Sequence, residues 1–87
     1  MLSKLKVLVL DDHAYQCALL KDMLEEAGFP HVDTALDAHD ALDQIWREKH
    51  QLVLMDVDMP GMDGAQFIHE LACRGLNPIL AIVTGCS

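Results

Sequence analysis

"LVLMDVDMPG", residues 52–61, carries an apolar segment into two acids and then into a proline and a glycine. Leu52–Met55 has no polar residue, which is typical of a strand covered on both faces, as in a parallel sheet. Asp56 follows directly, and Pro60 and Gly61 predict a sharp turn just beyond it. The sequence therefore predicts a buried strand whose carboxyl end presents an acid instead of running into the next helix.

Three further segments have the character of strands. Leu5–Leu10 and Ile79–Val83 are almost entirely aliphatic, whereas Val32–Ala35 alternates with polar residues and suits a sheet edge. The segments between them show the periodicity of helices. Strands that alternate with helices specify an α/β fold, here a doubly wound parallel sheet. We expect the flavodoxin-like strand order 2-1-3-4.

Each of the three expected helices has an apolar stripe that should face the sheet. Asp37 is well placed to cap the second helix, Asp63-Gly64 starts the third, and Gly28 and Gly75 supply stops after the first and third. The residues expected to be buried are Leu20, Met23, Leu24 and Ala27 in the first helix, Ala38, Ala41, Leu42, Ile45 and Trp46 in the second, and Phe67, Ile68, Leu71 and Ala72 in the third.

Composition limits the possible functions. The chain has 87 residues, is 52% hydrophobic and carries a formal net charge of −8, which predicts one small acidic domain over residues 1–87. Such a charge argues against nucleic acid as a partner. Cys17, Cys73 and Cys86 are expected to be buried free thiols in a reducing cytoplasm. No apolar run approaches the ~20 residues that span a bilayer, so a cytoplasmic location without membrane contact is expected.

The acids at the strand ends should meet. Asp11 and Asp12 end the first strand and Asp56 ends the third, so in the expected order their carboxylates share one crevice. A divalent cation would relieve their repulsion, and hard oxygen ligands favour Mg²⁺, or Mn²⁺, over zinc. Carboxylates around such a cation can also serve phosphoryl transfer, in which the cation neutralises phosphate charge while one carboxylate attacks. Thr84 ends the fourth strand, where its hydroxyl would be in reach of a phosphoryl oxygen on Asp56. His13 is expected at the rim of this site, and the other histidines are not expected to form a ligand cluster.

At these residues the chain resembles the receiver domain of two-component response regulators. The matching stretches are "VLVLDDH", "LVLMDVDMPGMDG" and "ILAIVTG". The resemblance implies that Asp56 is the phosphoacceptor and that Asp12 binds Mg²⁺, assisted by Asp11. It also implies a metal ligand in the backbone carbonyl of Asp58 and a phosphoryl-sensing hydroxyl in Thr84. A sensor histidine kinase or phosphotransfer protein would donate the phosphoryl group.

The chain departs from this family at its C-terminal end. The family fold continues with a helix, a strand that ends in a phosphoryl-binding lysine, and a final helix. Here no lysine follows Lys49 and the sequence stops at Ser87. Either the chain is a truncated piece of a longer protein, which we expect, or a partner chain completes it. Any output domain would lie beyond residue 87. The apolar edge of Ile79–Val83 would then favour dimerisation.

Two other functions fit parts of the sequence. Asp56-Val57-Asp58 is similar to the nucleophile and acid-base pair of haloacid-dehalogenase-type phosphatases, but that motif follows the first strand of its fold. A phosphorylation-independent interaction module is the third possibility, because the lysine is missing. A receiver should take up one phosphoryl group per chain, whereas a phosphatase should turn over many substrate molecules.

Overall fold

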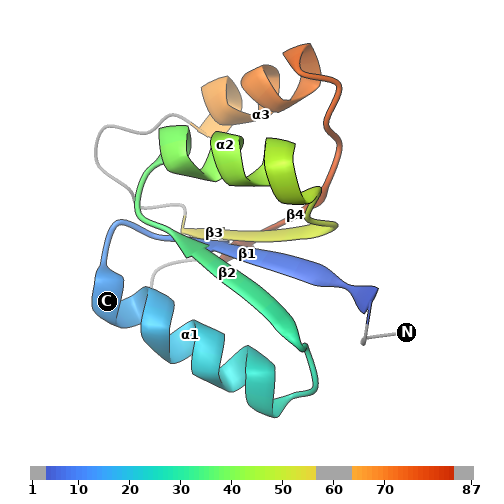
Figure 1. Ribbon diagram of the computed structural model, residues 1–87. Coiled ribbons are helices and arrows are strands. Elements are labelled where there is room, and N and C mark those ends of the chain that lie inside the picture. The colour runs from blue at the N-terminus through green and yellow to red at the C-terminus, as the bar shows by residue number, and fades with distance from the viewer. Residues whose placement is uncertain (1–3, 57–63, 84–87) are drawn as a thin grey trace.

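A parallel four-stranded sheet between two helical layers forms the fold (Figure 1). The structure is a computed structural model that describes residues 4–56 and 64–83. Its strand order, β2-β1-β3-β4, confirms the expected order and the parallel sheet. The elements are β1 (Lys6–Leu10), α1 (Ala14–Glu26), β2 (His31–Ala35), α2 (Ala38–Glu48), β3 (Leu52–Asp56), α3 (Gly64–Cys73) and β4 (Ile79–Val83).

The strand register brings two acid-bearing strand ends together. Leu10, the last residue of β1, pairs with Met55 of β3 on one side and with Ala35 of β2 on the other. Asp11 therefore leaves β1 beside the point where Asp56 ends β3. Both lie at the carboxyl edge of the sheet, where parallel α/β folds bind their ligands.

Two apolar clusters, one on each face, explain why the strands have continuous apolar sequences. On one face, Leu8 and Leu10 of β1 pack with buried residues of α2 and α3. On the other face, Val7 and Val9 pack with Cys17 of α1. All four β1 side chains are fully buried, as expected for a central strand of a parallel sheet.

Helix α1 contacts the sheet through a face different from the expected one. Cys17 is buried, and Leu20 and Leu24 pack beside it against the α1 side of the sheet. Met23 is 56% exposed and Ala27 lies beyond the helix, so the prediction that these two are buried was wrong. Cys17, Leu20 and Leu24 are spaced i, i+3, i+7 and form a narrow stripe on the helix. Met23 lies outside this stripe.

Helices α2 and α3 also contact the sheet along narrower stripes than the sequence suggested. Ala41, Leu42 and Ile45 of α2 are buried, as are Phe67 and Leu71 of α3. The exposed residues that were expected in the core are Trp46, Ile68 and Ala72, with Trp46 52% and Ile68 48% exposed. Each helix touches one sheet face, so residues at the margin of its apolar stripe remain in solvent.

The helix ends follow the expected capping chemistry. The Asp37 carboxylate accepts a 2.8 Å hydrogen bond from the Asp40 backbone N–H at the start of α2. Gly28 and Gly75 have φ values of 110° and 71°, which confirms their role as left-handed stops. Lys49 adopts the left-handed conformation without being a glycine, at φ 56°, and reverses the chain between α2 and β3.

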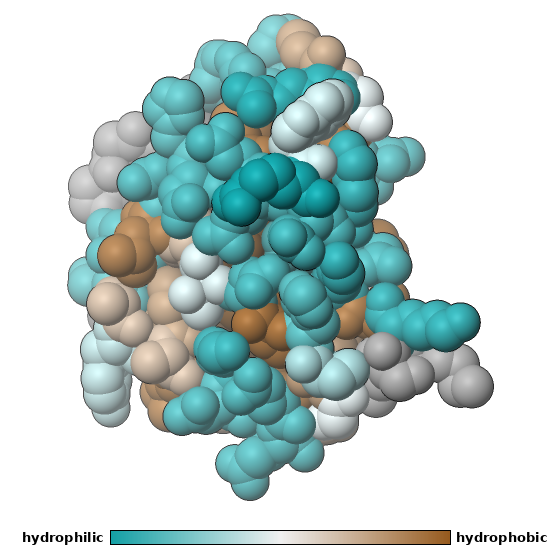
Figure 2. All heavy atoms as spheres, in the orientation of Figure 1, coloured by the Kyte–Doolittle hydropathy of each residue, from teal (hydrophilic) through white to brown (hydrophobic). Residues whose placement is uncertain are grey.

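Most of the surface in Figure 2 is hydrophilic, and apolar atoms are visible at the level of the sheet and in the lower left of the view. Within residues 4–56 and 64–83, no helix has both the length and the apolar character needed to cross a bilayer.

Candidate functional site

Four side chains converge at the carboxyl edge of the sheet. Asp11, Asp12, His13 and Asp56 each offer a ligand atom, and these atoms all lie within 4.8 Å of one another. The first three belong to the turn between β1 and α1, and Asp56 is the last residue of β3. The structure thus brings together the three acids that the sequence placed in one crevice.

Asp11 is the most firmly held member of this acid cluster. Its side chain is only 7% exposed, and its backbone N–H donates to the carbonyl of Ala35 at 3.1 Å. Its carboxylate accepts a 3.0 Å hydrogen bond from the His13 backbone N–H. The Cys17 thiol donates to the Asp11 carbonyl at 3.3 Å. Backbone and side chain are therefore both fixed before any ligand arrives.

His13 contacts two of the acids. Its Nδ1 atom lies 3.1 Å from a carboxylate oxygen of Asp11 and 2.9 Å from one of Asp12. The hydrogen bond with Asp11, followed by the charge of Asp12, raises the pKa of His13, and Asp56 adds a smaller effect of the same sign. The His13 side chain is 66% exposed, which agrees with a place at the rim. When protonated, it offsets part of the negative charge of the cluster.

Asp56 and Asp12 are the acids of the cluster that solvent can reach. Asp56 is partly buried and its backbone pairs with Val83 of β4, so β3 holds its position. The Asp12 side chain is 31% exposed. A ligand that approaches from solvent can therefore reach two carboxylates, while Asp11 forms the buried floor.

The donor chemistry of the cluster fits a hard divalent cation. Three of its four groups are carboxylates, and oxygen ligands of this type suit Mg²⁺ or Mn²⁺. The imidazole of His13 is a less suitable ligand for Mg²⁺ and is better explained as a counter-charge. Asp58, Pro60, Gly61 and Thr84 lie outside the described residues, so the roles expected for them are not placed in the structure.

Sequence reasoning missed a second group of side chains that could hold a metal ion. His31, Asp33 and His50 also bring one ligand atom each to within 4.8 Å of the others, so the expectation that these histidines form no cluster was wrong. Alternation along β2 puts His31 and Asp33 on one face, and the sequence could have revealed that much. The approach of His50, from the turn before β3, depends on the tertiary fold.

The cysteines only partly match the prediction of buried thiols. Cys17 is buried, and this burial raises the pKa of its thiol. Cys73 is exposed near the end of α3, where its sulfur lies 3.5 Å from Nε2 of His69. Cys86 lies outside the described residues. Cys73 is therefore a surface thiol and the prediction for it was wrong.

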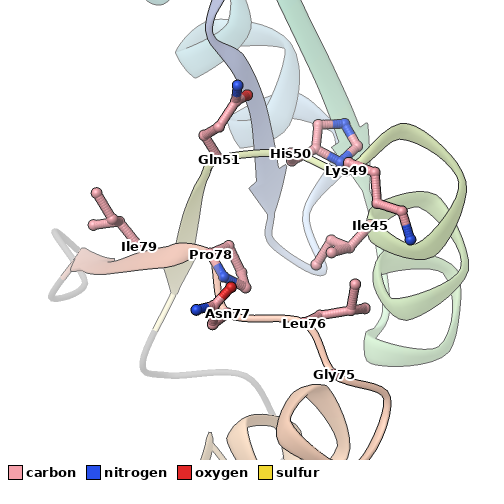
Figure 3. Close-up of a pocket in the computed structure, with 9 residues that line it drawn as sticks. All are labelled: Ile45, Lys49, His50, Gln51, Gly75, Leu76, Asn77, Pro78 and Ile79. Carbon is pink, nitrogen blue, oxygen red and sulfur yellow. The ribbon is translucent and has the colours of Figure 1, made fainter.

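An open pocket lies at the other end of the sheet, near the amino ends of β3 and β4 (Figure 3). Its volume is about 450 Å³, and it is lined by Ile45, residues 49–51 and residues 75–79. No member of the acid cluster lines it. The pocket is therefore separate from the site at the carboxyl edge.

Comparison with known proteins identifies the family that this arrangement matches. A family model described as the response regulator receiver domain matches residues 7–87. The transcriptional regulatory protein ZraR of Salmonella typhimurium is 38% identical over 80 residues, which are 92% of this chain and 18% of ZraR. A probable chemotaxis protein CheY of Rhizobium etli is 37% identical over 68 residues, 78% of this chain and 53% of that protein.

A solved structure supports the same match. The receiver domain of NtrC4 from Aquifex aeolicus superposes with a TM-score of 0.76 at 31% identity, covering 95% of this chain and 68% of that one. The chain spans about half the length of the CheY relative and less than a fifth of ZraR.

Proposed function

The chain belongs to the response regulator receiver domain family, and from this premise we propose that Asp56 accepts a phosphoryl group in two-component signalling. The observation that carries the proposal is the acid cluster. Asp11, Asp12 and Asp56 meet at the carboxyl edge of the sheet, with ligand atoms within 4.8 Å. A solvent-accessible carboxylate beside two others can serve as a nucleophile once their repulsion is neutralised.

The transfer is an in-line displacement at phosphorus. A carboxylate oxygen of Asp56 forms the new P–O bond while the P–N bond of a donor phosphohistidine breaks, and the imidazole leaves with the electron pair. Asp11 and Asp12, with the backbone carbonyl of Asp58, would hold Mg²⁺ together with Asp56. When bound, the cation offsets the charge on the phosphoryl oxygens. The hydroxyl of Thr84 would then bind a phosphoryl oxygen.

His13 contributes to the same chemistry as a charge beside the acids. Its Nδ1 atom bridges Asp11 and Asp12 at 3.1 and 2.9 Å, so it holds their carboxylates together when no cation does so. Because its ring is at the rim, it can turn outwards when a cation takes over the neutralisation. His13 is thus a positioning residue in this proposal.

The partners follow from this chemistry. We propose residues 1–87 as one receiver domain in the cytoplasm, served by a sensor histidine kinase or a phosphotransfer protein. Ile79 and Ile82 of β4 are 70% and 56% exposed, so the β4 edge is our candidate surface for self-association. A receiver domain is a signalling unit, and any enzymatic output would belong to another part of the parent protein.

A phosphatase of the haloacid-dehalogenase type is not favoured. The nucleophile of such enzymes follows the first strand of the fold, whereas Asp56 ends β3. The acids at the end of β1 would also have no partner role in that motif. The number of phosphoryl groups processed per chain separates the two functions.

The test is phosphorylation by a small-molecule acyl phosphate in the presence of Mg²⁺, followed by intact mass spectrometry. We expect at most one phosphoryl group per chain, in an alkali-labile linkage, and none on Asp56→Asn. Asp40→Asn is the matched control, because Asp40 is an exposed acid in the first turn of α2. Equal labelling of Asp56→Asn would show that another residue is the nucleophile. Repeated turnover of the donor would favour the phosphatase.

A further inference from the structure

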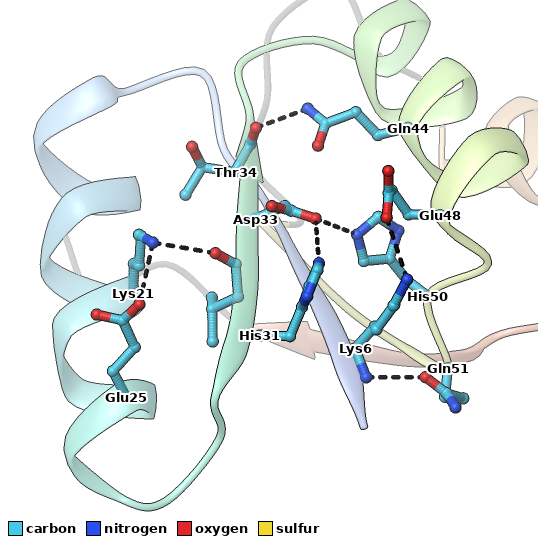
Figure 4. Close-up of polar contacts among 11 residues, drawn as sticks. Lys6, Lys21, Glu25, His31, Asp33, Thr34, Gln44, Glu48, His50 and Gln51 are labelled. Carbon is cyan, nitrogen blue, oxygen red and sulfur yellow. Dashed lines mark hydrogen bonds and ion pairs between the residues drawn. The ribbon is translucent and has the colours of Figure 1, made fainter. Parts of the chain in front are cut away.

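We propose that His31, Asp33 and His50 form a second metal site, which takes a zinc-class divalent ion. This His-Asp-His cluster is formed by β2 and the turn before β3 (Figure 4). It is independent of the phosphoacceptor proposal, because it shares no residue with the acid cluster.

The two clusters lie towards opposite ends of the sheet. His31 pairs with Lys6 at the amino end of β1, whereas Asp11 follows the carboxyl end of the same strand. Asp11 is five residues beyond Lys6 along the chain, which is a span of about 17 Å at the usual rise per residue. An ion bound by His31 is therefore distant from Asp56.

Local structure places the three ligands. His31 and Asp33 are two residues apart in β2, so their side chains lie on the same face of the sheet. It is the α2 side, because Ala35, two residues further on, packs against α2. Lys49, in the left-handed conformation, turns the chain at the end of α2 and brings His50 back toward the sheet. The Gln51 backbone N–H donates to the Lys6 carbonyl at 3.0 Å, which fixes the turn against β1. The ligand from the turn thus has a rigid anchor.

Both histidines point at the same oxygen atom. Nε2 of His50 lies 2.7 Å from Oδ2 of Asp33, and Nε2 of His31 lies 3.1 Å from it. Three ligand atoms around a zinc ion at about 2.0–2.1 Å lie near 3.3 Å from one another in tetrahedral geometry. Small side-chain movements would therefore admit an ion between them.

The protonation of His50 does not oppose metal binding. Its side chain is fully buried, and its Nδ1 atom has no hydrogen-bond partner among the described residues. While Nε2–H donates to Asp33, Nδ1 is an unpaired acceptor. If the proton moves to Nδ1, the Nε2 lone pair becomes available to an ion, and Nδ1 changes from an unpaired acceptor to an unpaired donor. No hydrogen bond at Nδ1 has to be broken.

Asp33 is suited to be the anionic ligand. Burial alone would raise its pKa, but the hydrogen bond from His50 and the charge and hydrogen bond of His31 outweigh burial and lower the pKa of Asp33. The carboxylate is therefore charged at neutral pH. Glu48 adds negative charge nearby, although Lys6 holds it in a 3.1 Å ion pair.

The ligand types select the class of ion. Two imidazoles and one carboxylate suit zinc and its neighbours among the divalent transition metals, whereas Mg²⁺ prefers oxygen ligands alone. The side chains of His31 and Asp33 are 41% and 33% exposed, so an ion can enter from solvent and keep water as a further ligand.

The test is calorimetric titration of the purified protein with Zn²⁺ in the presence of excess Mg²⁺, which would compete with zinc for the acid cluster. We expect one zinc ion per chain. His31→Gln should weaken binding by more than the roughly 10–100-fold that follows loss of an outer-shell partner. His39→Gln, at an exposed position on α2, is the matched control and should bind zinc like the unchanged protein.

Three further variants assign the ion to its ligands. Asp33→Asn should also weaken zinc binding, whereas Asp12→Asn and Cys73→Ser should not. His31 is preferred to His50 as the principal variant, because it is partly exposed and its replacement leaves the core intact. Circular dichroism of each variant checks its folding.

Three results would overturn the proposal. The first is the absence of zinc binding in the micromolar range. The second is unchanged binding by His31→Gln and Asp33→Asn, which would leave the cluster as a hydrogen-bond network only. The third is loss of binding in Asp12→Asn or Cys73→Ser, which would place the ion elsewhere. Cobalt substitution gives a separate readout, because a sulfur-to-cobalt absorption band would identify a cysteine ligand.

Discussion

Replacing Asp56 by asparagine should make the metal-free protein more stable. The substitution keeps the size of the side chain and removes one negative charge from a cluster of three. Asp56 ends β3 beside Asp11 and Asp12, and the ligand atoms of all three lie within 4.8 Å of one another. Without a cation, the folded state therefore contains a repulsion that the unfolded chain largely escapes.

The size of the effect follows from the separation of the charges. Two unit charges 4.8 Å apart repel by about 0.9 kcal/mol in water-like surroundings and about 3.5 kcal/mol at an effective dielectric constant of about 20. Asp12 and Asp56 are both partly open to solvent, so the smaller repulsion energy, about 0.9 kcal/mol per pair, describes them better. With two neighbouring carboxylates, we expect the Asn variant to gain about 2 kcal/mol at low ionic strength.

Magnesium should reverse this order. A ligand that binds only the folded state stabilises it by about 2.7 kcal/mol at a concentration 100 times its dissociation constant. The unchanged protein should show this gain, whereas Asp56→Asn loses a charged metal ligand and should show much less. Urea unfolding followed by far-ultraviolet circular dichroism, with chelator and then with Mg²⁺, measures both differences.

Two outcomes would refute the reasoning. One is an Asn variant that is less stable than the unchanged protein in chelator, because the acids would then not repel one another in the folded state. The other is an equal magnesium response in both proteins. Asp43→Asn is the control, since Asp43 is an exposed acid on α2, and it should change neither measurement.

Three further predictions concern the fold. Asp37→Ala should lower the free energy of unfolding by about 1 kcal/mol in urea titrations, because α2 loses its N-cap hydrogen bond. Phe67→Ala should lower it by about 3–5 kcal/mol in the same assay, because the ring is 2% exposed and anchors α3 to the sheet. With Cys86 replaced by serine, a thiol reagent should label exposed Cys73 rapidly and buried Cys17 only as fast as the protein opens, as followed by mass spectrometry.

The two stability predictions each have a matched control on the same element. Asp43→Ala removes an acid from α2 without touching its cap, and should change stability by less than about 0.5 kcal/mol. Ile68→Ala removes a half-exposed side chain next to Phe67, so an equal loss from both variants would contradict the packing of α3. Rapid labelling of Cys17 in the folded protein would contradict its burial.

The strands and the acid cluster were accessible from the sequence for a physical reason. Continuous apolar runs identify strands buried on both faces, and β4 was predicted with its observed bounds, Ile79–Val83. A parallel sheet then forces the ends of β1 and β3 to one edge, so Asp11 and Asp56 had to be neighbours once the strand order was right. Short-range pattern and a general rule of topology were enough.

The errors have two causes, and neither can be read from the order of residue types. Periodicity gives the direction of an apolar stripe but not its contact width, so Met23 and Trp46 were placed in the core although each lies at the margin of its helix face. The His-Asp-His cluster was missed because β1 lies between β2 and β3 in the sheet, and only the turn at Lys49 brings His50 across to Asp33. Neither contact width nor a turn of this kind is visible in a pattern of residue types.

The position of Trp46 has a practical consequence. The indole lies late in α2, with Nζ of Lys49 4.1 Å from the centre of its ring, and the chain contains no other tryptophan. Trp46 is nine residues beyond Asp37, the N-cap of α2, and so lies about 14 Å along the helix from its amino end, which is the end nearer the acid cluster. Its emission is thus a built-in optical reporter for the turn that carries His50. If added zinc quenches this emission and magnesium or a phosphodonor does not, one fluorescence measurement distinguishes binding at the His-Asp-His cluster from binding at the acid cluster.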